Sequence, residues 1–96
     1  MQPVYVVCNF DERALLAVAL GKPVVVLTPR ERQLLEQLMG GHPNKMIAYH
    51  IGLKHETVKL YMSRLFRKIG VPNRASAVAW AMRNLEDPVH QEPPIQ

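Results

Sequence analysis

The sequence predicts a mainly α-helical protein, preceded by a short N-terminal segment with a helix between two β strands. Two observations support this fold class. Apolar residues recur at helical spacing in several stretches between Thr28 and Leu85, and capping residues or glycines bound these stretches. Before them, the runs PVYVV and KPVVVL are rich in valine, as strands are. A chain of 96 residues forms one domain near the small end for a stable monomer.

Residues 1–26 are predicted to form the strand, helix and strand, with the helix DERALLAVALG closed by Gly21. Two strands alone are marginal in water. We therefore expect this segment to pack on the rest of the domain, to pair with another copy, or to form the edge of something larger. Asp11 is a possible helix cap. It is not expected to accept a phosphoryl group, because a phospho-accepting receiver domain needs several times this length.

The stretch LTPRERQLLEQLMGG has the clearest helix start in the chain. Thr28 is placed to cap the helix, Pro29 occupies the first helical position, and Glu31 completes a capping box. Gly40 and Gly41 end the helix. The expected buried stripe is Leu34, Leu35, Leu38 and Met39.

Residues 44–70 are predicted to form two short helices joined at Gly52, which can take the left-handed conformation of a sharp helix end. Ala48 is small enough for the two helices to cross closely there. This is the pattern of a helix-turn-helix, at about residues 44–63. In the second helix, the expected buried stripe is Val58, Met62, Leu65, Phe66 and Ile69.

The opposite face of the second helix is predicted to read DNA. Lys59 and Arg64 can donate to guanine edges or phosphates, and Leu60 suits a thymine methyl group. Arg67 and Lys68, one turn further along, are expected to meet the phosphate backbone. The alternative is an ordinary solvated helix face. At a turn of about 100° per residue, the outward positions are Glu56, Leu60, Ser63 and Arg67.

The charge of the chain is concentrated in this unit. Residues 42–74 carry seven Lys and Arg against Glu56 alone, whereas the net charge of the whole chain is +4. A concentrated positive charge is the electrostatic footprint of a protein that binds phosphates.

The last predicted helix begins after Asn73 and runs to about Leu85. It is apolar around most of its circumference, which implies a second buried face. We interpret this face as a homodimer contact, with packing on the N-terminal segment as the alternative. The residues assigned to the contact are Ala75, Val78, Ala79 and Met82. Residues 86–96 are rich in proline and are predicted to be a disordered tail.

Other functional classes find little support. No pair of acids, glycine-rich phosphate loop or nucleophile with a base indicates an enzyme, and no cofactor is expected. Metal binding is not expected either, because the histidines lack further ligands at suitable spacing; they are His42, His50, His55 and His90. Cys8 is the only cysteine, and no run is long enough to span a membrane. These features favour a cytoplasmic protein.

Leu27 to Leu85 resembles the LuxR-type (GerE or FixJ type) helix-turn-helix of bacterial transcription regulators. The resemblance rests on LTPRE, on NK followed by IA, on TVK and on KIGVPNR before AVAWAMRNL. It implies a four-helix domain that dimerises through its last helix and places its third helix in the major groove. By position, Lys45 and Thr57 resemble backbone-contacting residues. Lys59, Leu60 and Ser63 resemble base-facing residues, and we also assign Tyr61, Arg64 and Arg67 to the DNA contact.

The chain departs from the usual family pattern at two helix starts. Pro43 and Met46 stand where a serine and a glutamate usually form a capping box, and Lys54 replaces a capping serine or threonine. Each loss costs about 0.5–2 kcal/mol. Ser63 replaces a residue that is often basic or longer. Neither a receiver nor a signal-binding module fits within the residues before this domain.

The leading hypothesis is a small stand-alone transcription regulator that binds double-stranded DNA as a homodimer. The alternative is a protein-interaction module, either partnering another regulator or antagonising it without binding DNA. Salt dependence separates them, because binding through several phosphates weakens steeply with ionic strength and an apolar helix contact does not.

Overall fold

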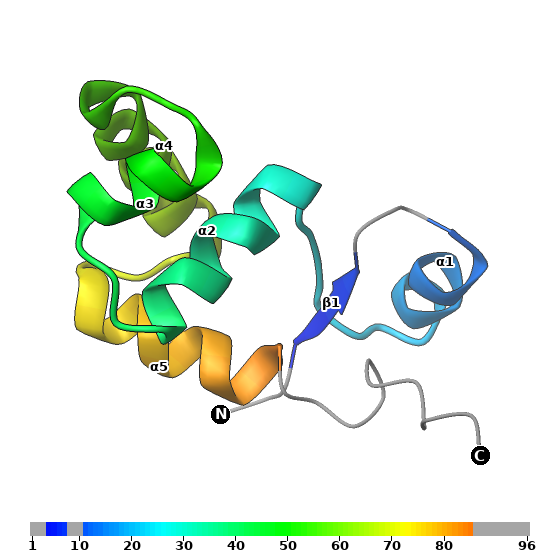
Figure 1. The fold of residues 1–96 in the computed structure, drawn as a ribbon. Coiled ribbons are helices and arrows are strands. Elements are labelled where there is room, and N and C mark those ends of the chain that lie inside the picture. Colours follow the sequence, from blue (N-terminus) through cyan, green and yellow to red (C-terminus); the bar gives the residue numbers. More distant parts are fainter. Residues whose placement is uncertain (1–3, 8–10, 86–96) are drawn as a thin grey trace, which may run out of the picture.

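The computed structural model describes residues 4–7 and 11–85, and within these the chain is mainly helical, as predicted (Figure 1). The predicted tail, residues 86–96, lies outside the described residues. None of the described helices is both long and apolar enough to cross a membrane. The elements in chain order are β1 (Tyr5–Val7), α1 (Glu12–Ala19), β2 (Val24–Val26), α2 (Pro29–Met39), α3 (Asn44–Ile51), α4 (His55–Ile69) and α5 (Arg74–Asn84).

The predicted helix caps of α1, α2 and α5 are confirmed. Asp11 and Asn73 each accept a hydrogen bond from the backbone N–H three residues later, at 3.1 and 2.8 Å. Thr28 and Glu31 form the complete capping box, with N···O distances of 3.1 and 2.8 Å. By contrast, α3 and α4 start at Pro43 and Lys54 without a side-chain cap, as the departures from the family pattern imply.

Helices α2 to α5 enclose one hydrophobic core. Helix α2 packs mainly on α5, and α3 packs on α4. Trp80 of α5 is buried at the base of the core with 7% of its surface exposed. The largest fully buried side chains come from the β2–α2 junction, α2, α3 and α4: Leu27, Leu34, Leu35, Leu38, Ile47, Val58 and Leu65.

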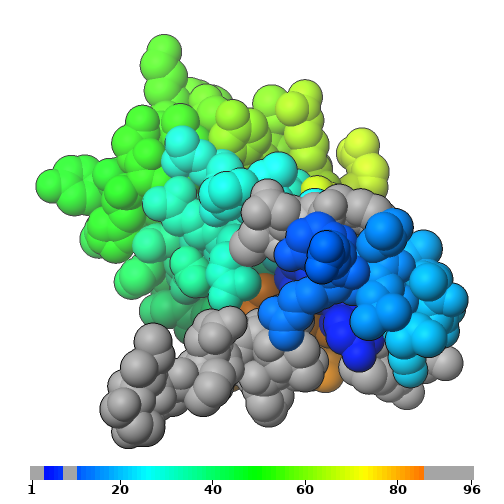
Figure 2. Space-filling model, turned by 90° about the vertical axis from the view of Figure 1, so that its right-hand side faces the viewer, coloured from blue at the N-terminus to red at the C-terminus, as the bar shows by residue number. Residues whose placement is uncertain are grey.

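The N-terminal segment packs on this core, which was one of the three possibilities that the sequence left open. Strands β1 and β2 are parallel neighbours in register, with Val6 beside Val25. Val6 is buried in the core and Val25 packs against it. Helix α1 lies on the other side of the strand pair, away from α2 and α5, and projects to one side of the molecule (Figures 1 and 2). Its buried residues are small: Ala14 and Ala17.

Candidate nucleic-acid interface

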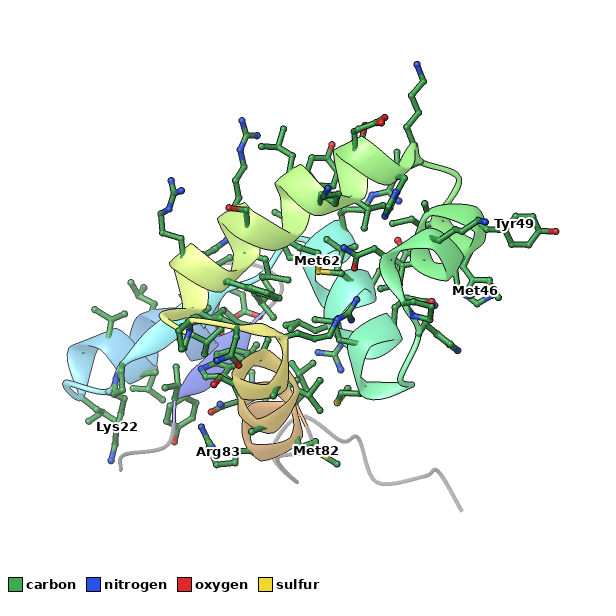
Figure 3. The ribbon with its side chains drawn as sticks, turned by 90° about the vertical axis from the view of Figure 1, so that its left-hand side faces the viewer. Lys22, Met46, Tyr49, Met62, Met82 and Arg83 are labelled. Atoms are coloured by element: carbon green, nitrogen blue, oxygen red, sulfur yellow. The ribbon has the colours of Figure 1, made fainter. Side chains whose placement is uncertain are left out.

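Helix α4 has one buried face and one exposed face. Val58, Met62, Leu65 and Ile69 are buried, at the spacing of three or four residues that places them on one side of a helix. Side chains on the other face project away from the rest of the protein (Figure 3). The exposed residues are Glu56, Lys59, Leu60, Ser63, Arg64, Arg67 and Lys68.

The turn between α3 and α4 fixes the direction of the exposed face. Gly52 ends α3 with φ +71°, which a residue with a Cβ rarely adopts, and Leu53 N–H donates to Ala48 O at 3.0 Å. Ala48 is buried at the α3–α4 crossing, and Leu53 packs against the core. The close crossing and the αL residue are the features that the sequence predicted for a helix-turn-helix.

Leu60 has no core to join, since 49% of its surface is exposed in the middle of the charged face of α4. An exposed leucine flanked by Lys59 and Ser63 offers an apolar contact among polar donors. In a DNA major groove, this combination can meet a thymine methyl group and neighbouring base edges.

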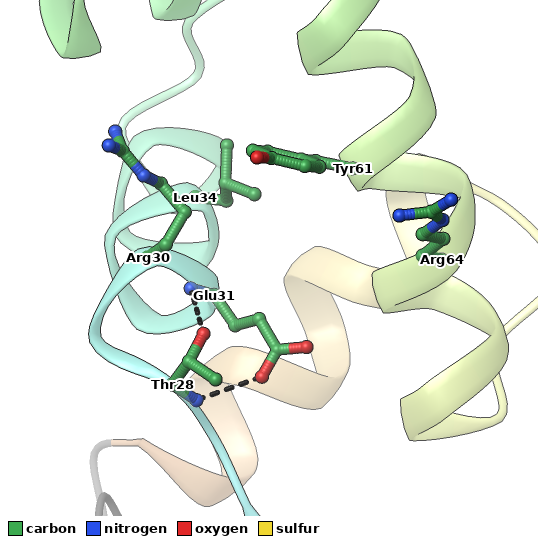
Figure 4. Close-up of a pocket in the computed structure, with 6 residues that line it drawn as sticks. All are labelled: Thr28, Arg30, Glu31, Leu34, Tyr61 and Arg64. Carbon is green, nitrogen blue, oxygen red and sulfur yellow. Dashed lines mark hydrogen bonds between the residues drawn. The ribbon is translucent and has the colours of Figure 1, made fainter.

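The remaining predicted DNA contacts occupy different environments around α4. Lys45 is exposed in the first turn of α3, and Thr57 is half-buried in the first turn of α4. Tyr61 is also half-buried, and with Arg64 it lines a groove of about 280 Å³ between α4 and the start of α2 (Figure 4). Tyr61 therefore packs against the core and also lies at the rim of the exposed face.

Lys68, on the exposed side of α4, forms an ion pair within the protein. Its Nζ lies 2.7 Å from Oε1 of Glu31, which also accepts the hydrogen bond from Thr28. The expected contact of Lys68 with the DNA backbone stays a prediction, and in this structure the Lys68 charge is paired with Glu31. Periodicity placed Lys68 on the correct side of α4 but could not reveal that α2 approaches there.

Arg74 is a second cation used inside the protein. Its Nη2 donates to Asn44 Oδ1 at 2.6 Å, and its Nη1 donates to His42 O at 3.2 Å. These bonds tie the first turn of α5 to the start of α3. This contact could not be predicted from the sequence, in which the only signal is an arginine placed unfavourably near the positive end of a helix dipole.

Two histidines meet at the side of α2. Nδ1 of His42 and Nδ1 of His50 lie 2.9 and 2.7 Å from Oε1 of Gln37, and their rings pack edge to face at 4.9 Å. Both nitrogens donate in the tautomers that satisfy this carbonyl oxygen. The described residues contain no group of three or more metal-ligating side chains.

Helix α5 presents the predicted dimer face. Met82 is 59% exposed, Ala75 is exposed, and Val78 and Ala79 are half-buried. Ala75 and Val78 line a groove of about 580 Å³ together with residues from the end of α2 and the loop after it. The opposite side of α5 is buried through Ala77, Trp80, Ala81 and Asn84. The helix therefore leaves an apolar strip accessible beside a groove.

The comparisons with known proteins agree with this architecture. The chain is 47% identical over 57 residues to the probable transcriptional regulatory protein SgaR of Hyphomicrobium methylovorum, covering 59% of this chain and 27% of that protein. It is 43% identical over 60 residues to the probable csgAB operon transcriptional regulatory protein of Salmonella typhimurium, covering 62% of this chain and 28% of that protein.

A third relative is the nitrate/nitrite response regulator protein NarL of Escherichia coli, 38% identical over 66 residues, covering 69% of this chain and 27% of that protein. The chain thus matches little more than a quarter of the length of these relatives. The family model described as bacterial regulatory proteins, luxR family, matches residues 25–81, which include all of α2, α3 and α4. With this match and the helix-turn-helix geometry of α3 and α4, the chain belongs to the LuxR family of bacterial regulatory proteins.

Proposed function

We propose that this chain regulates transcription by binding double-stranded DNA sequence-specifically as a homodimer, with α4 in the major groove. The observation that carries the proposal is the outer face of α4. It combines the exposed cations Lys59, Arg64 and Arg67 with the half-exposed Leu60. A buried stripe on the opposite side holds this face outward. The protein acts in the cytoplasm, where bacterial DNA lies.

The proposed DNA contact of each residue follows from the position of its side chain on α3 or α4. Lys59, Leu60 and Ser63 face base edges from the exposed side of α4 and select the sequence. Arg64, Arg67 and Tyr61 lie along the flank and further end of α4. Phosphate contacts come from Lys45 in α3 and Thr57 in α4, near the uncapped starts of both helices, and from Arg67.

The homodimer is proposed to form through α5. Its exposed Met82 and Ala75 and half-buried Val78 and Ala79 make an apolar strip with small residues, which allows a second α5 to approach closely. The groove beside Ala75 and Val78 can accept a larger side chain from that helix. A two-fold axis at α5 relates two copies of α4 and matches a two-fold symmetric DNA site.

The test is a fluorescence-anisotropy titration of mixed duplex DNA at two salt concentrations. It compares native protein with the double variant Lys59→Ala plus Arg64→Ala. The matched control, Lys22→Ala plus Arg83→Ala, also removes one lysine and one arginine, but from positions far from α4 (Figure 3). We expect the α4 variant to bind DNA at least about tenfold more weakly than native protein, and to lose more affinity than the control variant at both salt concentrations.

Equal effects of the two double variants would refute the α4 interface, because net charge alone would then explain binding. Native protein that is folded but fails to bind DNA at low salt would refute the proposal that this chain itself binds DNA. That result would favour an interaction module that pairs with another regulator.

A further inference from the structure

The outer edge of β2 is a surface that the proposed DNA contact does not use. In a parallel pair, alternate residues of a strand bond to a given neighbour. The hydrogen bond from Tyr5 N to Pro23 O, at 2.9 Å, fixes which residues of β2 face β1. The backbone groups of Val24 and Val26 therefore point away from β1. Among the described residues, no further strand pairs with them.

The two edges of this small sheet differ. At the β1 edge, Val4 N–H donates to Asn84 Oδ1 at 3.4 Å, so the end of α5 lies against it. The β2 edge consists of three β-branched residues without charge, preceded by Lys22 and Pro23. Edge strands normally avoid pairing by carrying charges, prolines or bulges within the strand. The β2 edge is short, at three residues, but it carries no charge, proline or bulge within the strand, so its backbone groups can pair.

Helix α1 is apolar over a wider arc than two strands can cover. Its buried face is narrow, yet large apolar residues flank it on both sides. Because a parallel β-α-β connection is right-handed, Leu15 and Val18 lie on the β2 side of α1, and Leu16 and Leu20 lie on the β1 side. The exposed fractions are 59% for Leu15, 49% for Val18, 61% for Leu16 and 66% for Leu20.

We propose that the β2 edge binds the β2 edge of a second copy of this chain, in antiparallel orientation about a two-fold axis at Val25. This register is self-complementary. With Val25 opposite its own copy, Val24 of each chain exchanges both backbone hydrogen bonds with Val26 of the other. The product is a four-stranded sheet in the order β1-β2-β2-β1, with both α1 helices on one face.

The spacing of the helices favours a second copy over an unrelated strand. Since α1 covers β1 and β2 together, the two α1 helices would lie two strand spacings apart, about 10 Å. Packed helices are typically separated by about 8–10 Å. Leu15 and Val18 of one copy would thus meet the same residues of the other. The contact is small and belongs with weak interfaces, which bury less than about 1,200 Å² in total.

The first test is amide hydrogen exchange measured by NMR on the full chain at low and high protein concentration. Val25 is an internal control, because its backbone bonds to β1 in each monomer. We expect protection of Val24 and Val26 to rise by about tenfold or more with concentration, while Val25 stays constant. Absence of protection at the highest concentration overturns the proposal. Protection that is independent of concentration also overturns it, since another part of the same chain would then cover the edge.

The second test measures self-association by analytical ultracentrifugation without DNA. Met82→Glu is introduced first, so that the proposed α5 contact does not contribute. In this background, we expect Leu15→Lys plus Val18→Lys to weaken dimerisation at least tenfold. The matched control, Leu16→Lys plus Leu20→Lys, alters exposed apolar positions on the other flank and should have little effect. Equal effects would overturn the β2 contact without affecting the DNA proposal, which the anisotropy titration tests separately.

Discussion

Substitutions of Glu31 should separate two contributions to stability that meet at one carboxylate. Its Oε1 accepts from the backbone N–H of Thr28 at 2.8 Å and from Nζ of Lys68 at 2.7 Å. Glutamine keeps an oxygen for Thr28 but carries no charge for Lys68. Alanine provides neither. Glu31→Gln therefore removes the ion pair alone, whereas Glu31→Ala removes both the ion pair and the capping bond.

The magnitudes follow from exposure. The side chains of Lys68 and Glu31 are 38% and 22% exposed, so the ion pair contributes no more than about 0.5–1 kcal/mol. The capping interaction contributes about 1 kcal/mol. We expect Glu31→Gln to lower Tm by about 2–8 °C and Glu31→Ala by about 6–16 °C, using about 4–8 °C per kcal/mol for a domain of this size.

The effect of Glu31→Gln should disappear in acid. Partial burial raises the pKa of Glu31, but the hydrogen bond and charge of Lys68 and the hydrogen bonds with Thr28 outweigh it, so the pKa falls below its ordinary value of 4.5. A lowered folded-state pKa gives stability that is present above the unfolded-state pKa and is lost as pH falls through the folded-state pKa. Native protein and Glu31→Gln should therefore differ at about pH 7 and converge at about pH 2–3.

Thermal unfolding followed by circular dichroism at both pH values measures these differences. Lys68→Met completes a double-mutant cycle that isolates the ion pair. Two results would refute the reasoning: Glu31→Gln as unstable as Glu31→Ala at neutral pH, or a difference between native protein and Glu31→Gln that is unchanged in acid.

Two further substitutions test the geometry around α3 and α4 by the same unfolding measurement. Lys54→Ser should raise the free energy of unfolding by about 0.5–1 kcal/mol, because serine can cap α4 and Lys54 does not; Lys54→Ala is the control, and an equal gain there would exclude capping as the cause. Gly52→Ala should lower the free energy of unfolding by about 1–2 kcal/mol. Backbone strain alone would cause this loss, since φ is +71° and nothing lies within 4 Å of an added Cβ. Gly52→Asn should lower the free energy of unfolding by less, because asparagine adopts the left-handed conformation more readily than alanine. Similar losses of stability for both variants would argue against that conformation.

The parts of the fold that could be predicted depend on neighbours in sequence. The capping box of α2 needs only Thr28 and Glu31, three residues apart, and the αL end of α3 needs only Gly52. The faces of α4 follow from its periodicity for the same reason. These features are confirmed because no distant contact was required to specify them.

The parts that could not be predicted depend on how the helices approach one another. The basic, outward position of Lys68 along α4 predicts a contact with the DNA backbone, whereas its ion-pair partner Glu31 lies 37 residues earlier, in another helix. The N-terminal segment was equally undetermined. Its packing depends on Val6 and Val25 joining a core formed by α2 to α5, and a valine pattern does not identify the surface that it will meet.

Arg74 links the two halves of the proposed mechanism. Helix α3 begins without a side-chain cap at Pro43, so its start needs another restraint. The guanidinium of Arg74 supplies one by binding Asn44 Oδ1 and His42 O from the first turn of α5. Because α5 also carries the proposed dimer strip, the same helix that sets the two-fold axis holds the start of α3. The angle between two copies of α4 on DNA would then be set through this contact as well as through the turn at Gly52.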